Sequence, residues 1–157
     1  MSFKKYQYVA PVSPQDLTEC LSFTIDFPSC KFLHVGLDPS QHTVILIITP
    51  SRHILITVEF FQSINRLMGD ILSFLLNPPT YKKNVFSYTE TTTLSSMVYK
   101  GENVIVFESK TQDGCRVLLN REDLLQLITL ENRILQNIAR LEETRKASIT
   151  LRPHLNI

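Results

Sequence analysis

The chain has 157 residues, of which 43% are hydrophobic and 20% are charged, and its formal net charge is +1. This composition excludes a disordered chain and supplies enough apolar side chains for the core of one compact domain. The near-neutral charge argues against a strongly basic nucleic-acid-binding protein, although it permits a local basic patch.

The first sixteen residues contain two prolines and no hydrophobic period, so residues 1–16 are expected to form a flexible N-terminal arm. From residue 17 onward, apolar side chains alternate with polar ones, which is typical of half-buried strands. The pattern predicts strands over residues 20–27, 31–37, 43–48 and 53–57. The buried face of the first strand is expected to carry Leu21, Phe23, Ile25 and Phe27.

From Val58 to Leu76 the apolar period becomes helical. Thr57 is a suitable N-cap, because its hydroxyl oxygen can accept a hydrogen bond from an amide of the first turn. Pro78 and Pro79 are expected to end the helix. Its buried stripe is predicted to consist of Phe61, Ile64, Leu67, Met68, Ile71, Leu72 and Leu75.

The second half repeats this order, with strands predicted over residues 82–90, 94–99, 103–109 and 115–119. Asn120 is expected to cap a second helix, with Glu122 and Asp123 in its first turn, where acidic side chains suit the helix dipole. An irregular tail is predicted for residues 148–157. The predicted apolar stripe of the second helix consists of Leu124, Ile128, Ile134, Leu135, Ile138 and Leu141.

Four strands and a helix therefore occur twice, and Ile56-Thr57-Val58-Glu59 aligns with Leu119-Asn120-Arg121-Glu122. A unit of about 60 residues is marginally stable alone, so two units are expected to share one core. The sequence predicts an α+β fold in which two β-β-β-β-α repeats, residues 17–79 and 80–147, form an intramolecular pseudo-dimer. Its antiparallel sheets are expected to be curved and its helices packed together.

Three cysteines, Cys20, Cys30 and Cys115, form no CxxC pair, and we expect free, mostly buried thiols in a reducing compartment. The longest apolar run, Val44 to Ile48, is far shorter than the roughly 20 residues of a membrane-spanning helix. The N-terminus lacks the apolar segment of a signal peptide. We therefore expect a soluble nuclear protein, or alternatively a cytoplasmic one, without a membrane partner.

The segments YKGENVIVFES, from Tyr99, and GCRVLLNREDLLQL, from Gly114, resemble the positive cofactor four family of transcriptional coactivators. Tyr99, Lys100 and Gly101 match the aromatic, lysine and glycine of that family's strand-turn-strand segment. The strand-to-helix corner matches at Val117, Leu119, Asn120, Glu122, Leu124 and Leu127. The resemblance spans about residues 94–141 and, more weakly, residues 32–77, where Thr57, Glu59 and Phe61 correspond.

This resemblance implies β-β-β-β-α units that bind single-stranded DNA along curved sheets and act in transcription. The Whirly proteins and mitochondrial guide-RNA-binding relatives are similar to a version with the repeat fused in one chain. Two positions depart from the pattern, since Glu102 replaces the second turn lysine and Glu108 replaces an arginine. The corresponding turn of the first half, residues 38–42, has no lysine, so binding by one half or along a displaced path is expected.

Binding of single strands without sequence preference requires cations for the phosphates and flat rings on which bases stack. The run YKKNVFSY alternates, so its rings and lysines are expected to share a sheet face, unless it is a solvated edge strand with partly buried aromatics. The candidate nucleic-acid-binding residues are Tyr81, Lys82, Lys83, Phe86, Tyr88, Tyr99 and Lys100.

Three other features have a binding interpretation and a plainer one. The hydroxyls of residues 87–96 can contact phosphates or simply form an exposed threonine-rich strand or loop. The arm with Lys4, Lys5, Tyr6 and Tyr8 can wrap a nucleic acid or be a soluble tail. The charged side chains of the second helix are best explained as a solvated face with paired charges; they are Glu131, Arg133, Arg140, Glu142, Glu143, Arg145 and Lys146.

Metal binding and catalysis have little support in the sequence. Cys30 and His34 lie four residues apart, but two further ligands at zinc-site spacing are missing. No motif of a hydrolase, nucleotide-binding loop or paired-carboxylate enzyme is present. Cys115 follows a glycine, yet no histidine partner is suggested, so we expect a core or loop thiol. Neither an enzyme nor a cofactor is predicted.

The sequence therefore predicts a protein that binds single-stranded DNA or RNA, with DNA favoured, and resembles a transcriptional coactivator. The alternative is a protein-interaction or scaffold subunit on the same fold that has lost strand binding and that associates with protein partners or with itself as a homo-oligomer. Glu102 and Glu108 favour this alternative, whereas Tyr99-Lys100-Gly101 favours strand binding.

Overall fold

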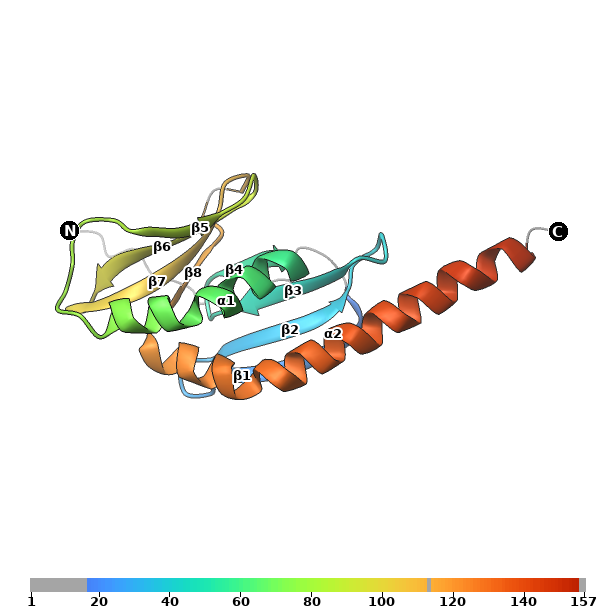
Figure 1. Cartoon of the computed structure of the whole chain (residues 1–157), viewed down its shortest axis with the longest axis horizontal. Coiled ribbons are helices and arrows are strands. Elements are labelled where there is room, and N and C mark those ends of the chain that lie inside the picture. The colour runs from blue at the N-terminus through green and yellow to red at the C-terminus, as the bar shows by residue number, and fades with distance from the viewer. Residues whose placement is uncertain (1–16, 113, 156–157) are drawn as a thin grey trace, which may run out of the picture.

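The computed structural model describes residues 17–112 and 114–155, and the side chains of these residues as far as residue 147. The fold is α+β, as predicted, with two four-stranded antiparallel sheets that are each followed by a helix (Figure 1). The first sheet consists of β1 (Thr18–Asp26), β2 (Lys31–Leu37), β3 (Thr43–Ile48) and β4 (His53–Thr57), followed by α1 (Val58–Leu75). The second consists of β5 (Val85–Tyr88), β6 (Thr92–Tyr99), β7 (Glu102–Ser109) and β8 (Arg116–Leu119), followed by α2 (Arg121–Leu155).

Both predicted strand-to-helix corners are confirmed. The Thr57 hydroxyl accepts a hydrogen bond of 3.1 Å from the Phe60 amide. The Asn120 side-chain oxygen accepts one of 2.8 Å from the Asp123 amide, and the Asp123 carboxylate accepts one of 3.0 Å from the Asn120 amide. Each cap supplies a partner for an amide that the first helical turn leaves unpaired. The chain therefore turns sharply from strand to helix at both places.

The hydrophobic core is one cluster that contains side chains from both sheets and both helices. Phe60 of α1 and Phe107 of β7 meet edge to face with ring centroids 6.3 Å apart. Helix α2 packs on β1 and β2 of the first sheet and also contacts α1, while α1 contacts strands of both sheets (Figure 1). The two repeats thus share one interior. A twofold rotation that relates them as a pseudo-dimer stays a prediction.

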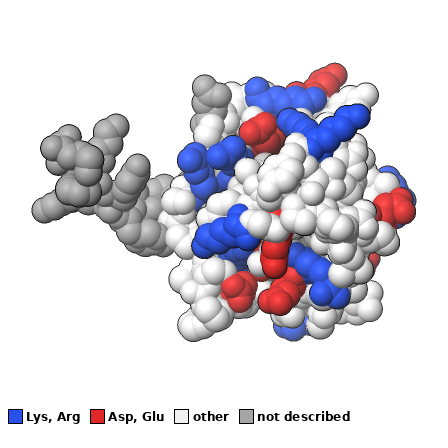
Figure 2. Space-filling view, turned by 90° about the vertical axis from the view of Figure 1, so that its left-hand side faces the viewer, with Lys and Arg blue, Asp and Glu red and all other residues white. Residues whose placement is uncertain are grey.

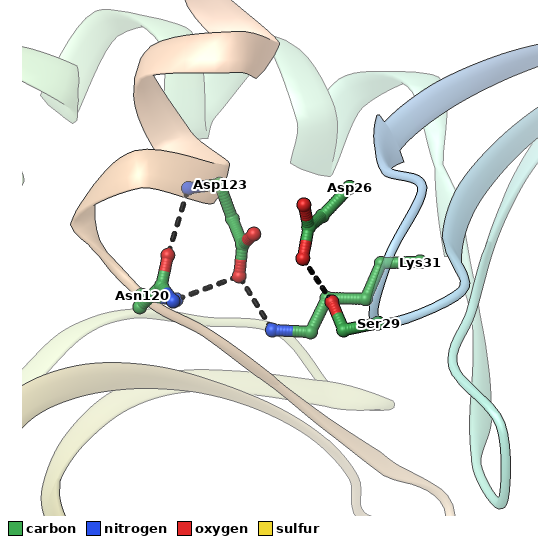
Figure 3. A network of polar contacts seen from close by, with 5 residues as sticks. All are labelled: Asp26, Ser29, Lys31, Asn120 and Asp123. Atoms are coloured by element: carbon green, nitrogen blue, oxygen red, sulfur yellow. Dashed lines mark hydrogen bonds and ion pairs between the residues drawn. The ribbon is translucent and has the colours of Figure 1, made fainter.

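A buried ion pair also joins the two repeats. Lys31 of β2 contacts the carboxylate of Asp123 in α2 at 2.6 Å, and their side chains are 18% and 3% exposed. Figure 3 shows this lysine reaching the capped first turn of α2, beside the hydrogen bond between Ser29 and Asp26. The Asp123 carboxylate therefore caps its own helix and binds the other repeat at the same time.

Several predicted details of the elements are wrong. Leu21 and Phe27 are 45% and 74% exposed, because β1 is an edge strand and Phe27 lies in the turn after it. On α2, Ile128 faces solvent, and the buried stripe runs instead through Leu127 and Leu130. The predicted irregular tail is wrong, because α2 continues past residue 148 as far as Leu155 and includes Pro153.

The cysteines are free, as predicted, but they are not mostly buried. Cys20 and Cys30 are exposed, and Cys115 is intermediate. Cys20 lies on the edge strand β1, and Cys30 lies in the β1–β2 turn with a positive φ of 55°.

In the part of the chain that the structure describes, no helix is long and apolar enough to cross a membrane.

Candidate nucleic-acid interface

The candidate surface is the face of the second sheet that points away from the core. Leu94, Phe107 and Val117 face the core, so the residues that alternate with them face outward. A row of outward residues crosses all four strands through Tyr88, Thr93, Glu108 and Arg116. We call this surface the outer face of the second sheet.

Two tyrosines on the outer face each have a lysine over the ring. The Lys110 ammonium lies 5.0 Å from the ring centroid of Tyr88, and the Lys100 ammonium lies 5.4 Å from that of Tyr99. The tyrosines are 71% and 49% exposed, which leaves ring surface for another ligand. Along β6, Tyr99 is six residues from the partner of Tyr88, or roughly 20 Å at the rise of a strand.

The Tyr99–Lys100 pair is held by a two-residue turn. Tyr99 pairs with Glu102 across the hairpin, and Lys100 and Gly101 have φ angles of 51° and 78°. Positive φ at both central residues is the geometry of a type I′ turn, whose twist matches that of the flanking strands. The sequence found this pair through its strand-turn-strand motif.

Sequence reasoning missed Lys110, which follows β7 in the chain. Its amide donates to the Thr91 carbonyl oxygen, and its ammonium donates to the Thr89 carbonyl oxygen at 2.6 Å. These contacts bring the end of β7 to the β5–β6 turn and so carry Lys110 over Tyr88. Only the pairing of β6 with β7 reveals this position, since the two residues lie 22 places apart in the sequence.

Three predicted candidates lie in the linker between α1 and β5 instead of in a strand. Tyr81 is 84% exposed, and Lys82 and Lys83 are also exposed. The predicted strand over residues 82–90 is limited to Val85–Tyr88, where pairing with β6 begins. The expected alternation of rings and lysines on one sheet face is therefore wrong for these residues.

Phe86 also departs from the predicted arrangement. It is half-buried and meets Phe74 of α1 edge to face, with ring centroids 5.4 Å apart. Its ring packs against the core and does not lie beside Tyr88 on the outer face. The structure therefore removes Phe86 from the set of exposed stacking surfaces.

The linker is held by Asn103 of β7, which is only 4% exposed. Its side-chain nitrogen donates to the carbonyl oxygens of Asn77 and Pro78 at 3.1 Å. Its side-chain oxygen accepts from the Thr80 amide at 2.9 Å. One buried amide thus fixes the path of the chain immediately before Tyr81 and the two lysines.

We expect Asn103→Ala to lower the free energy of unfolding by about 2 kcal/mol, because it removes the hydrogen bonds of a buried side chain to three backbone groups of the linker. Amide exchange in residues 76–84 should accelerate as the linker loosens. Urea unfolding and hydrogen-exchange mass spectrometry measure the two effects. The matched control is Asn84→Ala, at an exposed position of the same linker; equal protection of the linker in both variants would contradict the anchoring role.

The predicted acidic positions also lie on the outer face. Glu102 is the strand partner of Tyr99, and Glu108 lies between Thr93 and Arg116. Figure 2 looks at the end of the molecule that carries the linker and shows basic and acidic side chains interleaved, without a continuous basic groove. The end of the molecule seen in Figure 2 therefore presents separated cations with acidic side chains between them.

The first sheet offers little charge to a phosphate backbone. Its two cations are engaged, since Lys31 pairs with Asp123 and Arg52 donates to the Gly114 carbonyl oxygen at 2.6 Å. Burial lowers the pKa of His34 on β2 and so disfavours a positive charge on its imidazole. If the protein binds a nucleic-acid strand, we therefore expect the second repeat to do so.

The plainer interpretation of the hydroxyl-rich segment agrees with the structure. The Thr89 hydroxyl accepts hydrogen bonds from the Thr91 and Thr92 amides and so forms the turn before β6. On α2, Arg133 lies over the Phe23 ring, and Arg145 pairs with Glu142. The arm with Lys4, Lys5, Tyr6 and Tyr8 lies outside the described residues.

Among the residues that the structure describes, no group of three His, Cys, Asp or Glu side chains is close enough together to hold a metal ion.

A scan against protein-family models, a search of curated proteins and a search of solved structures each found no match to this chain.

Proposed function

We propose that this protein binds single-stranded nucleic acid, with DNA as the favoured ligand, on the outer face of its second sheet. The observation that carries the proposal is the pair of exposed tyrosines, Tyr88 and Tyr99, each with a lysine over its ring on the same face. Every nucleobase has a flat face, so tyrosines bind bases with little dependence on sequence. The neighbouring lysines neutralise the adjacent phosphates.

In this proposal Tyr99 and Tyr88 stack bases at two points about 20 Å apart. Lys100 and Lys110 contact phosphates beside the stacked bases, and the linker adds Lys82, Lys83 and the ring of Tyr81 at one end. With four lysines contacting phosphates, the logarithm of the binding constant should fall with the logarithm of salt concentration at a slope of about −3. Binding is therefore modest and sensitive to salt.

The resemblance to the positive cofactor four and Whirly-like families supports the same proposal. Two sheet-and-helix repeats in one chain are consistent with a fused dimer of such units. On this basis we propose a pseudo-dimeric coactivator-like protein that works in transcription or genome maintenance, in the nucleus.

A protein-interaction or scaffold subunit is the second candidate function. Between the two tyrosine–lysine pairs, the outward positions of β7 are Val104 and Val106, which are only 4% and 5% exposed and offer no charge, and Glu102 and Glu108 border them. No cation of β7 bridges the two tyrosine–lysine pairs, so a phosphate backbone gains no contact between them. This arrangement favours a surface that has lost strand binding.

Fluorescence anisotropy with labelled single-stranded oligonucleotides at low and high salt separates the two functions. We expect Tyr99→Ala/Lys100→Asn to weaken binding by about tenfold or more, since one base–tyrosine stack contributes about 1–3 kcal/mol. Asparagine is used at position 100 because it tolerates the positive φ of the turn.

Tyr88→Ala/Lys110→Ala should have a similar effect from the other end of the outer face. The matched control is Phe27→Ala/Arg66→Ala, which also removes one exposed ring and one cation, but from the first repeat. Absence of binding at low salt, or equal losses in the control, would reject strand binding in favour of the scaffold function.

A further inference from the structure

A cysteine and a histidine from the two repeats meet where the β3–β4 and β7–β8 loops lie side by side. The Cys115 sulfur lies 4.0 Å from Nε2 of His53 and donates to the side-chain oxygen of Gln112 at 3.3 Å. Arg52 binds the Gly114 carbonyl oxygen across the same junction. The sequence suggested no histidine partner for Cys115, and this expectation is wrong because the partner lies 62 residues away.

The thiol opens onto a small cavity of about 230 Å³. Its lining combines apolar residues of β4 with hydroxyl and amide side chains, which are those of Thr91, Thr92, Ser109, Thr111 and Gln112. These groups offer hydrogen bonds to a short polar chain that reaches the sulfur. Cys115 thus differs from a thiol buried in the core, because it has a histidine partner and lines a cavity that a ligand can enter.

We propose that Cys115 is a thiol-modification site that forms a mixed disulfide with low-molecular-weight disulfides of the glutathione class. The thiol proton, which the Gln112 side-chain oxygen accepts in the structure, moves to His53 Nε2, and the thiolate sulfur attacks one sulfur of the disulfide. A new sulfur–sulfur bond forms, the original one breaks, and the released thiolate takes up a proton. Cys115 is oxidised, and the departing half of the disulfide is reduced to a thiol.

The other two cysteines provide a comparison within the same molecule. Cys20 and Cys30 are both more exposed than Cys115, and none of the described hydrogen bonds joins either sulfur to a histidine. Although Cys20 is exposed as a residue, burial around its sulfur raises the pKa of the thiol and lowers its thiolate fraction. If exposure alone set the rate of reaction with a disulfide, Cys115 would be the slowest of the three cysteines. Its contact with His53 predicts instead that it reacts fastest.

The experiment treats the folded protein with oxidised glutathione and follows each cysteine by peptide mass spectrometry over time. We expect Cys115 to react faster than Cys20 and Cys30 by on the order of tenfold. His53→Gln should remove most of this advantage and leave the other two rates unchanged. His34→Gln is the matched control, because it removes a partly buried histidine of β2 instead.

Equal or slower reaction of Cys115 in the unsubstituted protein would overturn the proposal, and this comparison needs no variant to fold. An unchanged Cys115 rate in a folded His53→Gln variant would also overturn it. Circular dichroism establishes that each variant is folded before its rates are compared. The outcome is independent of whether the protein binds nucleic acid.

Discussion

Replacing Asp123 with alanine is expected to lower the free energy of unfolding by about 3–5 kcal/mol, because it leaves a largely buried lysine without its partner. The Lys31 side chain is 18% exposed and contacts the Asp123 carboxylate at 2.6 Å. The substitution also removes the acceptor for the Asn120 amide at the start of α2. Urea unfolding followed by circular dichroism measures the loss.

A double-mutant cycle with Lys31→Met and Asp123→Asn separates the ion pair from the helix cap. We expect the double variant to lose less stability than the sum of the single losses, by about 1–3 kcal/mol. The control is Glu142→Ala, which breaks the pair with Arg145; those side chains are 33% and 34% exposed, so a loss of at most about 1 kcal/mol is expected. Additive single losses would mean that Lys31 and Asp123 act independently.

Replacing Phe107 with alanine should also lower the free energy of unfolding, by about 3–5 kcal/mol. Phe107 is 1% exposed, lies between Leu94 and Val117 in the sheet, and meets Phe60 of the first repeat edge to face. The truncation removes buried apolar surface and leaves a cavity between the repeats. Because the core is one cluster, the whole chain should still unfold in a single transition at a lower urea concentration.

Phe27→Ala is the matched control, since Phe27 is 74% exposed and its truncation should change stability by less than about 0.5 kcal/mol. Two separate unfolding transitions, or loss of structure in the second repeat alone, would contradict a shared interior. The slope of the urea dependence reports the surface exposed in each transition and so distinguishes one unit from two.

The candidate site was only partly predictable. The sequence identified Tyr99 and Lys100 because their segment resembles the strand-turn-strand motif of the positive cofactor four family, whereas the two-residue turn that holds them is seen only in the structure. The sequence placed Phe86 on the exposed face, but its ring packs against Phe74 of α1. Alternation in a short edge strand does not show which face of the strand a neighbouring helix covers. Sequence reasoning missed Lys110, whose position over Tyr88 depends on strand pairing between separate hairpins.

The sequence by itself determined the local features, whose hydrogen bonds join residues three or four places apart. The caps at Thr57 and Asn120 and the change of hydrophobic period after each of them belong to this class. The tertiary structure alone decided the contacts across the repeats, Lys31 with Asp123 and His53 with Cys115, whose partners lie 92 and 62 residues apart. Such pairs produce no periodic pattern in the sequence, because they form only when two distant segments pack against each other.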